Sequence, residues 1–372
     1  MWNCWRGFLN LTIIGSNGFI GSNLVLNLSD DERVDKLFQI TSKSSLNDLK
    51  HALDESDVVI NLAGVNRSEN DQDFFDINVK FAKTVAQYVF DSNQCKKLIH
   101  SSSLHAGRPD AYGKSKEEGE NEIKKILNNS SIELFIERFP GVFGKNSKPN
   151  YNSVISTFCH NLANELEIKV DDPKKNIKIA YIDDVVEHIK NLIFSSNYSE
   201  PLNPIYEESV GKISEHLKDI SNKDNFIPNL GNDLVKKLHA TYLSYLNPAS
   251  FTKDLKVHED KRGAFSEIVK TSHGGQFSYV IANPGETRGM HYHHTKTEKF
   301  LVLSGKASFK QKNMFTGKVH EFILDAKKPK TIDSIPGYTH SIENIGKGKL
   351  IAVIWCNEIF DESRPDTYYK EI

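Results

Sequence analysis

The sequence predicts two domains: a doubly wound parallel sheet with helices on both faces, followed by an all-β sandwich or barrel. The chain has 372 residues, and at roughly 150 residues per domain this length suggests at least two domains. Up to about residue 245, short apolar runs alternate with stretches long enough for a helix, which is typical of a parallel sheet. After about residue 250, short strand-like runs follow one another across Gly- and Pro-containing turns, which is typical of an all-β domain.

Short apolar runs predict the strands of both domains. In the first domain each run precedes a polar or amphipathic segment, and the runs are Leu11–Ile14, Leu37–Thr41, Val58–Leu62, Lys97–Ser101 and Leu134–Glu137. In the second domain they are Phe277–Ala282, Glu298–Leu303, Ala307–Lys310, Val319–Leu324 and Leu350–Trp355. The segment Leu246–Thr252, which contains Asn247-Pro248, predicts a linker. We therefore expect a first domain over residues 1–246, a linker over 247–252 and a second domain over 253–372.

The composition excludes several classes of protein. Lys plus Arg is 47 and Asp plus Glu is 49, so the net charge of -2 argues against a nucleic-acid binder. No apolar run approaches the ~18 residues of a membrane span, and the apolar stretch Phe8–Ile14 lacks a signal-peptide cleavage site. The cysteines are scattered without a CxxC pair, which indicates reduced thiols and a cytoplasmic protein. They are Cys4, Cys95, Cys159 and Cys356.

A glycine-rich turn follows the first predicted strand and precedes an amphipathic stretch from Ser22 to Leu28. Glycines let backbone N–H groups approach a phosphate, and the helix N-terminus supplies partial positive charge. A tight turn without a ligand is the alternative interpretation. The pattern predicts that a dinucleotide binds at Gly15, Asn17, Gly18, Phe19, Ile20 and Gly21.

The end of the second strand favours NADPH over NADH. Asp or Glu usually meets the ribose hydroxyls of NADH at this place, whereas this chain has Ile40-Thr41-Ser42-Lys43. The hydroxyl of Ser42 and the cation of Lys43 suit a 2′-phosphate. The alternative is that Lys43 is a solvated loop lysine.

A proton-transfer set follows further along the chain. Tyr112 and Lys116 are spaced by four in a segment, Tyr112–Leu127, that predicts a helix, so both side chains share one face. A lysine ammonium beside a tyrosine lowers the phenol pKa, and a serine from the run Ser101–Ser103 can hydrogen-bond a substrate carbonyl. Beside a nicotinamide, such groups reduce a carbonyl or oxidise an alcohol.

Residues 9 to about 245 resemble an extended short-chain dehydrogenase/reductase of the nucleotide-sugar-modifying group, which has a Rossmann-type fold. The matching pieces are GSNGFIG, DVVINLAG, SSS followed by YGKSK, RFPGVFG and YIDDVV. The resemblance implies that Tyr112 is the general acid/base, Lys116 its partner and Ser103 the hydroxyl on the substrate oxygen, with Ser102 as the alternative. It places Leu62, Ala63, Gly64 and Pro140 at the cofactor with Tyr112 and Lys116. Tyr112 follows Ser103 by only nine positions, so the loop over the sugar differs from that of many relatives.

The second domain contains a pattern of metal ligands. His291 and His293 point to the same side of a strand, Glu298 opens the next strand, and His340 follows a Pro-Gly turn. Three imidazoles and a carboxylate suit Zn, Fe, Mn or Ni, whereas His294 points away if the strand is regular. The spacing resembles the first cupin motif, and the second motif is partial because Lys330 replaces its leading glycine. A cupin that has lost its metal is the alternative.

Both halves together resemble the CapF family of bifunctional capsular-polysaccharide enzymes, apart from the first eight residues. The matching stretches are NLAGVNR, KPNYNSVISTFC, TYLSYL, HHTKTEKFLVLSGK, PGYTHSIEN and IWCNEIFDESRPDTYY. The resemblance implies a homodimer with NADPH and a divalent metal, zinc, acting on a UDP-linked 4-keto-6-deoxy-hexosamine. It implies epimerisation at carbon 3 by the cupin and then reduction at carbon 4. The product would be UDP-2-acetamido-2,6-dideoxy-L-talose, a precursor of UDP-N-acetyl-L-fucosamine.

Two other functions remain open from the sequence. One is a reductase of single activity whose cupin only binds sugar or forms the dimer. The other is a non-catalytic sensor, against which the complete set of Ser103, Tyr112 and Lys116 argues. The chemistry fixes the order of the bifunctional alternative, because a ketone at carbon 4 acidifies the hydrogen on carbon 3 only until it is reduced.

Overall fold

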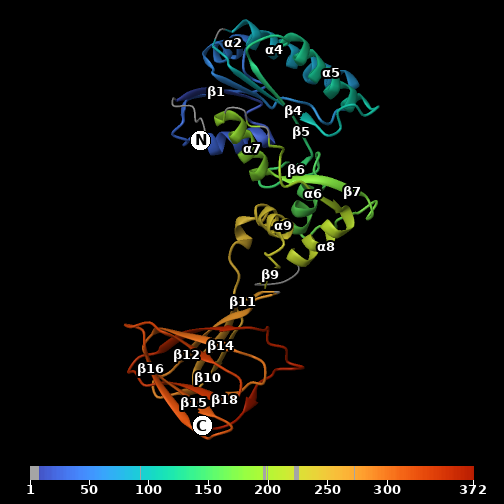
Figure 1. Ribbon diagram of the computed structural model, residues 1–372. Helices are drawn as coiled ribbons and strands as arrows, with labels where there is room; N and C mark the ends of the chain where they lie inside the picture. The colour runs from blue at the N-terminus through green and yellow to red at the C-terminus, as the bar shows by residue number, and fades with distance from the viewer. Residues whose placement is uncertain (1–7, 93, 196–197, 199, 222–225, 272) are drawn as a thin grey trace. The chain divides into compact units, whose positions relative to one another are not determined.

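The computed structural model describes residues 8–372 apart from residues 93, 196–197, 199, 222–225 and 272 (Figure 1). Cys4 therefore lies outside the described residues. So does the N-terminal extension, apart from its last residue, Phe8. The chain divides into two compact units. The first reaches Lys218 and includes Lys237–Leu246, and the second comprises Asp219–Lys236 and Asn247–Ile372. Residues 219–236, which the sequence assigns to the first domain, belong to the second unit.

The first unit is built on a five-stranded parallel sheet in the order β2-β1-β3-β4-β5. Its strands are β1 (Leu9–Ile14), β2 (Val34–Ile40), β3 (Val58–Asn61), β4 (Lys97–Ser103) and β5 (Glu133–Phe139). Each contains most or all of one predicted run. The doubly wound fold predicted from the alternating texture is therefore confirmed.

Helices cover both faces of this sheet (Figure 1). One face packs against α2 (Leu46–Glu55), α4 (Ala82–Asp91) and α5 (Ala111–Ile126), and the other against α1 (Phe19–Leu28) and α7 (Ile182–Phe194). The predicted helix from Tyr112 to Leu127 is thus α5. A short helix α3 (Asp71–Phe75) and a π-helical turn η1 (Asp76–Phe81) lead into α4. Each face has its own core of buried aliphatic side chains, such as Leu24 and Ile189 on one and Leu53 and Val85 on the other.

A smaller layer completes the first unit. A three-stranded sheet contains β6 (Gly141–Phe143), β7 (Asn176–Tyr181) and β8 (Tyr206–Ser209). The helices near it in sequence are α6 (Val154–Ala163), α8 (Val210–Ser221) and α9 (Asp233–Leu243). Among the described helices of the whole chain, none combines the length and the apolar character needed to cross a bilayer.

The second unit is an antiparallel sandwich of two sheets. One has the order β10-β11-β12-β19-β14-β17 with β9 beside β11, and the other β16-β15-β18-β13-β20. Its strands are β9 (Phe226–Ile227), β10 (Val257–Asp260), β11 (Gly263–Thr271), β12 (Gly275–Ala282), β13 (Thr287–Tyr292), β14 (Glu298–Ser304), β15 (Lys306–Asn313), β16 (Val319–Asp325), β17 (Thr331–Ser334), β18 (Tyr338–Asn344), β19 (Leu350–Cys356) and β20 (Tyr368–Tyr369). Phe300, Phe309 and Ile342 pack between the sheets. This is the jelly-roll architecture expected of a cupin.

Residues 219–236 join the second unit through a strand that the sequence does not predict. β9 pairs in parallel with β11, with Phe226 opposite Lys270 and Ile227 opposite Thr271. Two residues carry no periodicity, so the pattern of the sequence could not show this pairing. A 3₁₀ turn, Pro248–Ser250, lies within the predicted linker.

Candidate active site and metal centre

The glycine turn lies between β1 and α1 and packs tightly against the end of β3. Gly15 has a φ of +82°, and a Cβ there would lie 2.9 Å from the Ala63 nitrogen. A Cβ on Gly21 would lie 2.1 Å from the Gly15 oxygen, so both positions require glycine. The N-cap of α1 is Gly18, and no side chain caps this helix. The first-turn N–H groups are therefore available to a phosphate, which is the arrangement that a pyrophosphate needs.

A large cavity of about 1360 Å³ runs from this turn across the carboxyl ends of the sheet strands. Most of the predicted cofactor residues line it: Gly15, Asn17, Gly18, Phe19, Ile20, Gly21, Leu62, Gly64, Tyr112, Lys116 and Pro140. The other three do not. Ala63 packs against Gly15 instead, and Ser42 and Lys43 are exposed in the loop after β2. That loop adjoins the turn, because Gly15 N donates a hydrogen bond to Ile40 O at 2.8 Å.

Ser103, Tyr112 and Lys116 meet at the wall of this cavity. Ser103 ends β4 and hydrogen-bonds the Tyr112 phenol, which stands in the first turn of α5. The N-cap of this helix is Asp110, whose carboxylate accepts from Gly113 N at 2.7 Å. Lys116 is buried one turn further on, and its Nζ donates to Ser101 O at 3.3 Å.

The two serines that the sequence left as alternatives have different partners. Successive residues of a strand point to opposite faces, so Ser102 and Ser103 diverge. Ser102 Oγ donates to the carboxylate of Glu120 at 2.5 Å and is buried. Both serines contribute to the cavity wall, but Ser103 is the one whose side chain interacts with the Tyr112 phenol. This geometry favours Ser103 as the hydroxyl that contacts a substrate.

Burial controls the protonation of the tyrosine and the lysine. It raises the pKa of Tyr112, against a smaller lowering by the hydrogen bond with Ser103. It lowers the pKa of Lys116 to about 8, with Glu120 acting in the opposite direction. The expected lowering of the Tyr112 pKa by Lys116 stays a prediction, since the groups that shift this pKa besides burial are Ser103 and Asp110. Tyr112 is thus protonated at neutral pH and can donate a proton.

The structure contains an ion pair behind the site that the sequence did not predict. Glu120 is 1% exposed and accepts from Arg138 Nε at 2.8 Å and Nη2 at 2.7 Å, besides Ser102. Such a bidentate pair fixes geometry as well as charge. It ties α5 to the ends of β4 and β5. The position of Glu120, one helical turn after Lys116 on the same face, was the signal that could have revealed it.

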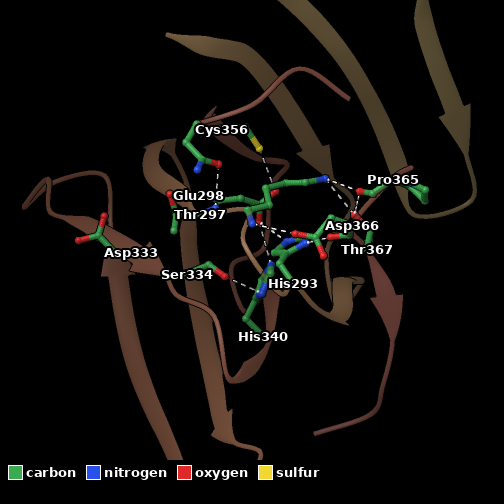
Figure 2. A network of polar contacts seen from close by, with 12 residues as sticks. His293, Thr297, Glu298, Asp333, Ser334, His340, Cys356, Pro365, Asp366 and Thr367 are labelled. Carbon is green, nitrogen blue, oxygen red and sulfur yellow. Dashed lines mark hydrogen bonds and ion pairs between the residues drawn. The ribbon is translucent and has the colours of Figure 1, made fainter. Parts of the chain in front are cut away.

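The four predicted metal ligands converge in the second unit, with ligand atoms that all lie within 4.8 Å of one another. His291 is on β13, Glu298 opens β14 and His340 is on β18. Glu298 Oε2 lies 3.3 Å from His293 Nε2 and 3.1 Å from His340 Nε2. Figure 2 shows His293 and His340 directed toward Glu298. His294 is exposed and contacts the Tyr292 and Tyr368 rings instead, as expected for a residue pointing away.

The donor atoms fit a divalent cation. His293 Nε2, Glu298 Oε2 and His340 Nε2 are buried and have no hydrogen-bond partner among the described residues. Buried polar atoms without partners are costly, and a bound ion would satisfy all three. Burial, together with His340, lowers the pKa of His291 to about 4. Burial would raise the pKa of Glu298, but the imidazoles of His293 and His340 hold it well below its usual value. A neutral imidazole and an ionised carboxylate are the forms that bind metals.

Each half of the chain matches a known protein family. Residues 11–197 match the NAD dependent epimerase/dehydratase family, and residues 258–368 match the polysaccharide biosynthesis C-terminal domain. A Pseudomonas aeruginosa protein, UDP-2-acetamido-2,6-beta-L-arabino-hexul-4-ose reductase, is 37% identical over 365 residues, which cover 97% of this chain and 98% of the relative.

Solved structures show the same relationship. The capsular polysaccharide assembling protein CapF from Staphylococcus aureus is 36% identical with a TM-score of 0.89, over 98% of this chain and 100% of that one. UDP-glucuronic acid 4-epimerase from Bacillus cereus, 18% identical with a TM-score of 0.52, covers 63% of this chain and 96% of its own. It shares the fold of the first unit.

The fold and the family match define an oxidoreductase with a nicotinamide cofactor, followed by a cupin domain. Over nearly its whole length, the chain belongs to the CapF family.

Proposed function

We propose that the first domain reduces the 4-keto group of a UDP-linked 4-keto-6-deoxy-hexosamine with NADPH. The observation that carries this proposal is the convergence of Ser103, Tyr112 and Lys116 on the cavity that the glycine turn also lines. The printed name of the Pseudomonas aeruginosa relative, a UDP-hexulose reductase, supports the substrate class.

The residues at the cavity divide the reduction among them. The Ser103 hydroxyl hydrogen-bonds the ketone oxygen and orients it toward Tyr112. The Tyr112 phenol, protonated because burial raises its pKa, gives its proton to that oxygen. Lys116 adds positive charge next to the phenolate that results, and with a pKa of about 8 it can pass on a proton. NADPH, when bound, supplies the hydride.

The choice of NADPH rests on the loop after β2. Ser42 and Lys43 are exposed there, beside the glycine turn that would hold the pyrophosphate. Because no acidic side chain occupies residues 41–45, this loop does not repel a 2′-phosphate.

We propose further that His291, His293, Glu298 and His340 hold one divalent ion, zinc, and that the cupin epimerises carbon 3 of the same sugar before the reduction. The buried donor atoms without partners support the ion. A bound ion would supply Lewis acidity to a ketone oxygen; a structural role is the alternative. The product would be UDP-2-acetamido-2,6-dideoxy-L-talose, for UDP-N-acetyl-L-fucosamine and capsule or O-antigen synthesis.

One observation favours a simpler alternative, in which the cupin binds sugar or another copy of the chain without catalysis. The printed name of the Pseudomonas aeruginosa relative mentions only reduction. The two functions differ in the configuration of the product at carbon 3.

The product of a UDP-GlcNAc dehydratase, incubated with the protein and NADPH, tests both steps. We expect the protein to consume NADPH. NMR of the product should show a new hydroxyl at carbon 4 and an inverted configuration at carbon 3. No NADPH consumption would contradict the reductase. Reduction with the original configuration at carbon 3 would contradict the epimerisation and support the simpler alternative.

A further inference from the structure

The end of the chain returns to the candidate metal centre. We define the C-terminal strap as residues 365–370. Its strand β20 pairs antiparallel with β13, so that Tyr369 lies opposite His291. The backbone oxygen of Lys370 accepts a hydrogen bond from Thr339 Oγ1 at 2.8 Å, next to His340. The strap therefore contacts both strands that carry histidine ligands.

The carboxylate of Asp366 is bound to the loop that separates two ligands. Its Oδ1 accepts from His294 N at 2.8 Å, and its Oδ2 accepts from the backbone nitrogens of Thr295 and Lys296, each at 2.8 Å. This loop connects His293 with Glu298. Hydrogen bonds from backbone N–H groups to a carboxylate are among the strong ones, so Asp366 fixes the path of the loop between the two ligands (Figure 2).

The carbonyl of the same residue sets the tautomer of His293. Asp366 O lies 2.5 Å from His293 Nδ1. A carbonyl oxygen can only accept, so Nδ1 carries the proton and the Nε2 lone pair is free. That Nε2 is the buried atom that faces Glu298. The partner of His340 Nδ1 is the Ser334 hydroxyl at 2.7 Å, which can donate or accept and imposes no such choice.

The backbone on either side of Asp366 is held by a buried lysine. Lys296 is 4% exposed, and its Nζ donates to Pro365 O at 2.8 Å and to Thr367 Oγ1 at 3.0 Å. Asp366 itself has a φ of +37°, which is unusual for a residue with a side chain. These contacts keep the carbonyl in line with His293.

We propose that Asp366 is a positioning residue of the metal centre: its carboxylate fixes the loop from His293 to Glu298, and its carbonyl holds His293 with Nε2 available to the ion. The proposal rests on the metal centre proposed above. Residues that orient metal ligands typically account for about 10- to 100-fold in metal affinity. Loss of the Asp366 carboxylate should weaken metal binding by about that factor.

The test uses the full-length protein, stripped with a chelator and titrated with Co²⁺ in competition with a chromophoric chelator. Asp366→Ala should bind Co²⁺ about 10- to 100-fold more weakly, with a changed visible absorption band because the loop from His293 to Glu298 loses the carboxylate that fixes it. Asp366→Asn keeps one acceptor oxygen and should be intermediate, and it serves if the alanine variant does not fold. The matched control is Asp361→Ala, since Asp361 accepts from Ser363 within its own turn; it should match the unmodified protein.

The possible results separate this proposal from the metal centre itself. Unchanged affinity and absorption in both Asp366 variants would overturn the positioning role, even if the melting temperature of the stripped protein fell. Equal weakening in Asp361→Ala would also overturn it, because any change in the segment would then suffice. If the unmodified protein does not bind Co²⁺, the metal centre is wrong and the role of Asp366 with it.

Discussion

Tyr112 and Ser103 are the residues on which the proposed reduction depends most directly. The phenol is half-buried, protonated and hydrogen-bonded to the serine that ends β4. The arrangement suits proton donation to a ketone, whereas a sensor would have no need of it. The same cavity wall contains Lys116, which burial brings to a pKa of about 8.

Tyr112→Phe should lower turnover about 100-fold or more, because it removes a general acid and keeps the ring. NADPH should still bind, because the glycine turn is unchanged. NADPH oxidation with the 4-keto UDP-sugar measures the first effect and NADPH fluorescence the second. Tyr88→Phe, in α4 and away from the cavity lining, is the control. A normal rate in Tyr112→Phe would remove this residue from the mechanism.

Lys43→Asp should reverse part of the preference for NADPH. The change replaces an exposed cation with an anion near a bound 2′-phosphate, which should reduce kcat/KM for NADPH by about tenfold and leave NADH little affected. Lys50→Asp, an equally exposed change in α2, is the control. Equal kcat/KM with both cofactors in the unmodified protein would contradict the preference itself.

Some site residues could be predicted from the sequence because their spacing determines where they lie. The glycine turn, the Tyr112–Lys116 pair and the His291–His293 pair each lie within one element or at its edge. Asp366 and Arg138 could not be predicted, because each meets its partner across a distance in sequence that no periodicity records. The rise of the Tyr112 pKa could not be predicted for a similar reason, because it depends mainly on burial, which the tertiary fold decides.

Among the elements, the strand β4 shows how one segment serves both the core and the site. Its carboxyl end supplies Ser102 and Ser103, and its first residue, Lys97, is buried beneath the end of α7. Lys97 Nζ donates to Leu192 O at 2.6 Å and to Ser195 O at 3.0 Å. A cation at this helix end satisfies carbonyls that the helix leaves unpaired and complements its dipole.

Lys97→Met should destabilise the protein by about 1–3 kcal/mol, since it leaves these carbonyls without their donor while it keeps an apolar chain of similar size. Urea unfolding followed by circular dichroism measures this. The neighbouring Lys96→Met removes a partly exposed ion pair with Asp57 and should cost no more than about 1 kcal/mol. Equal effects of the two substitutions would show that Lys97 does not support α7.

The strands and helices of the first unit were predictable where their periodicity was long. Five apolar runs gave the five strands of the parallel sheet, and the amphipathic pattern after Tyr112 gave α5. The two-residue strands β9 and β20 could not be predicted from the sequence. Both belong to the sheets of the second unit, because β9 pairs with β11 and β20 pairs with β13. Their pairing depends on tertiary contacts and not on local pattern.

For the molecule as a whole, we propose that one chain performs two reactions on one sugar in a fixed order. Both use the ketone at carbon 4: epimerisation needs it to acidify the hydrogen on carbon 3, and reduction consumes it. The two sets of residues lie in different compact units. A change in the cupin ligands should therefore stop the first reaction and leave NADPH binding unaffected.

Deuterium exchange at carbon 3 tests this proposed sequence of reactions most directly. In deuterium oxide without NADPH, the unmodified protein should introduce deuterium at carbon 3 of the 4-keto UDP-sugar, as seen by NMR. His291→Asn should not, while it still binds NADPH and reduces the sugar with its original configuration at carbon 3. No exchange with the unmodified protein, or normal exchange with His291→Asn, would contradict the assignment of epimerisation to these cupin ligands.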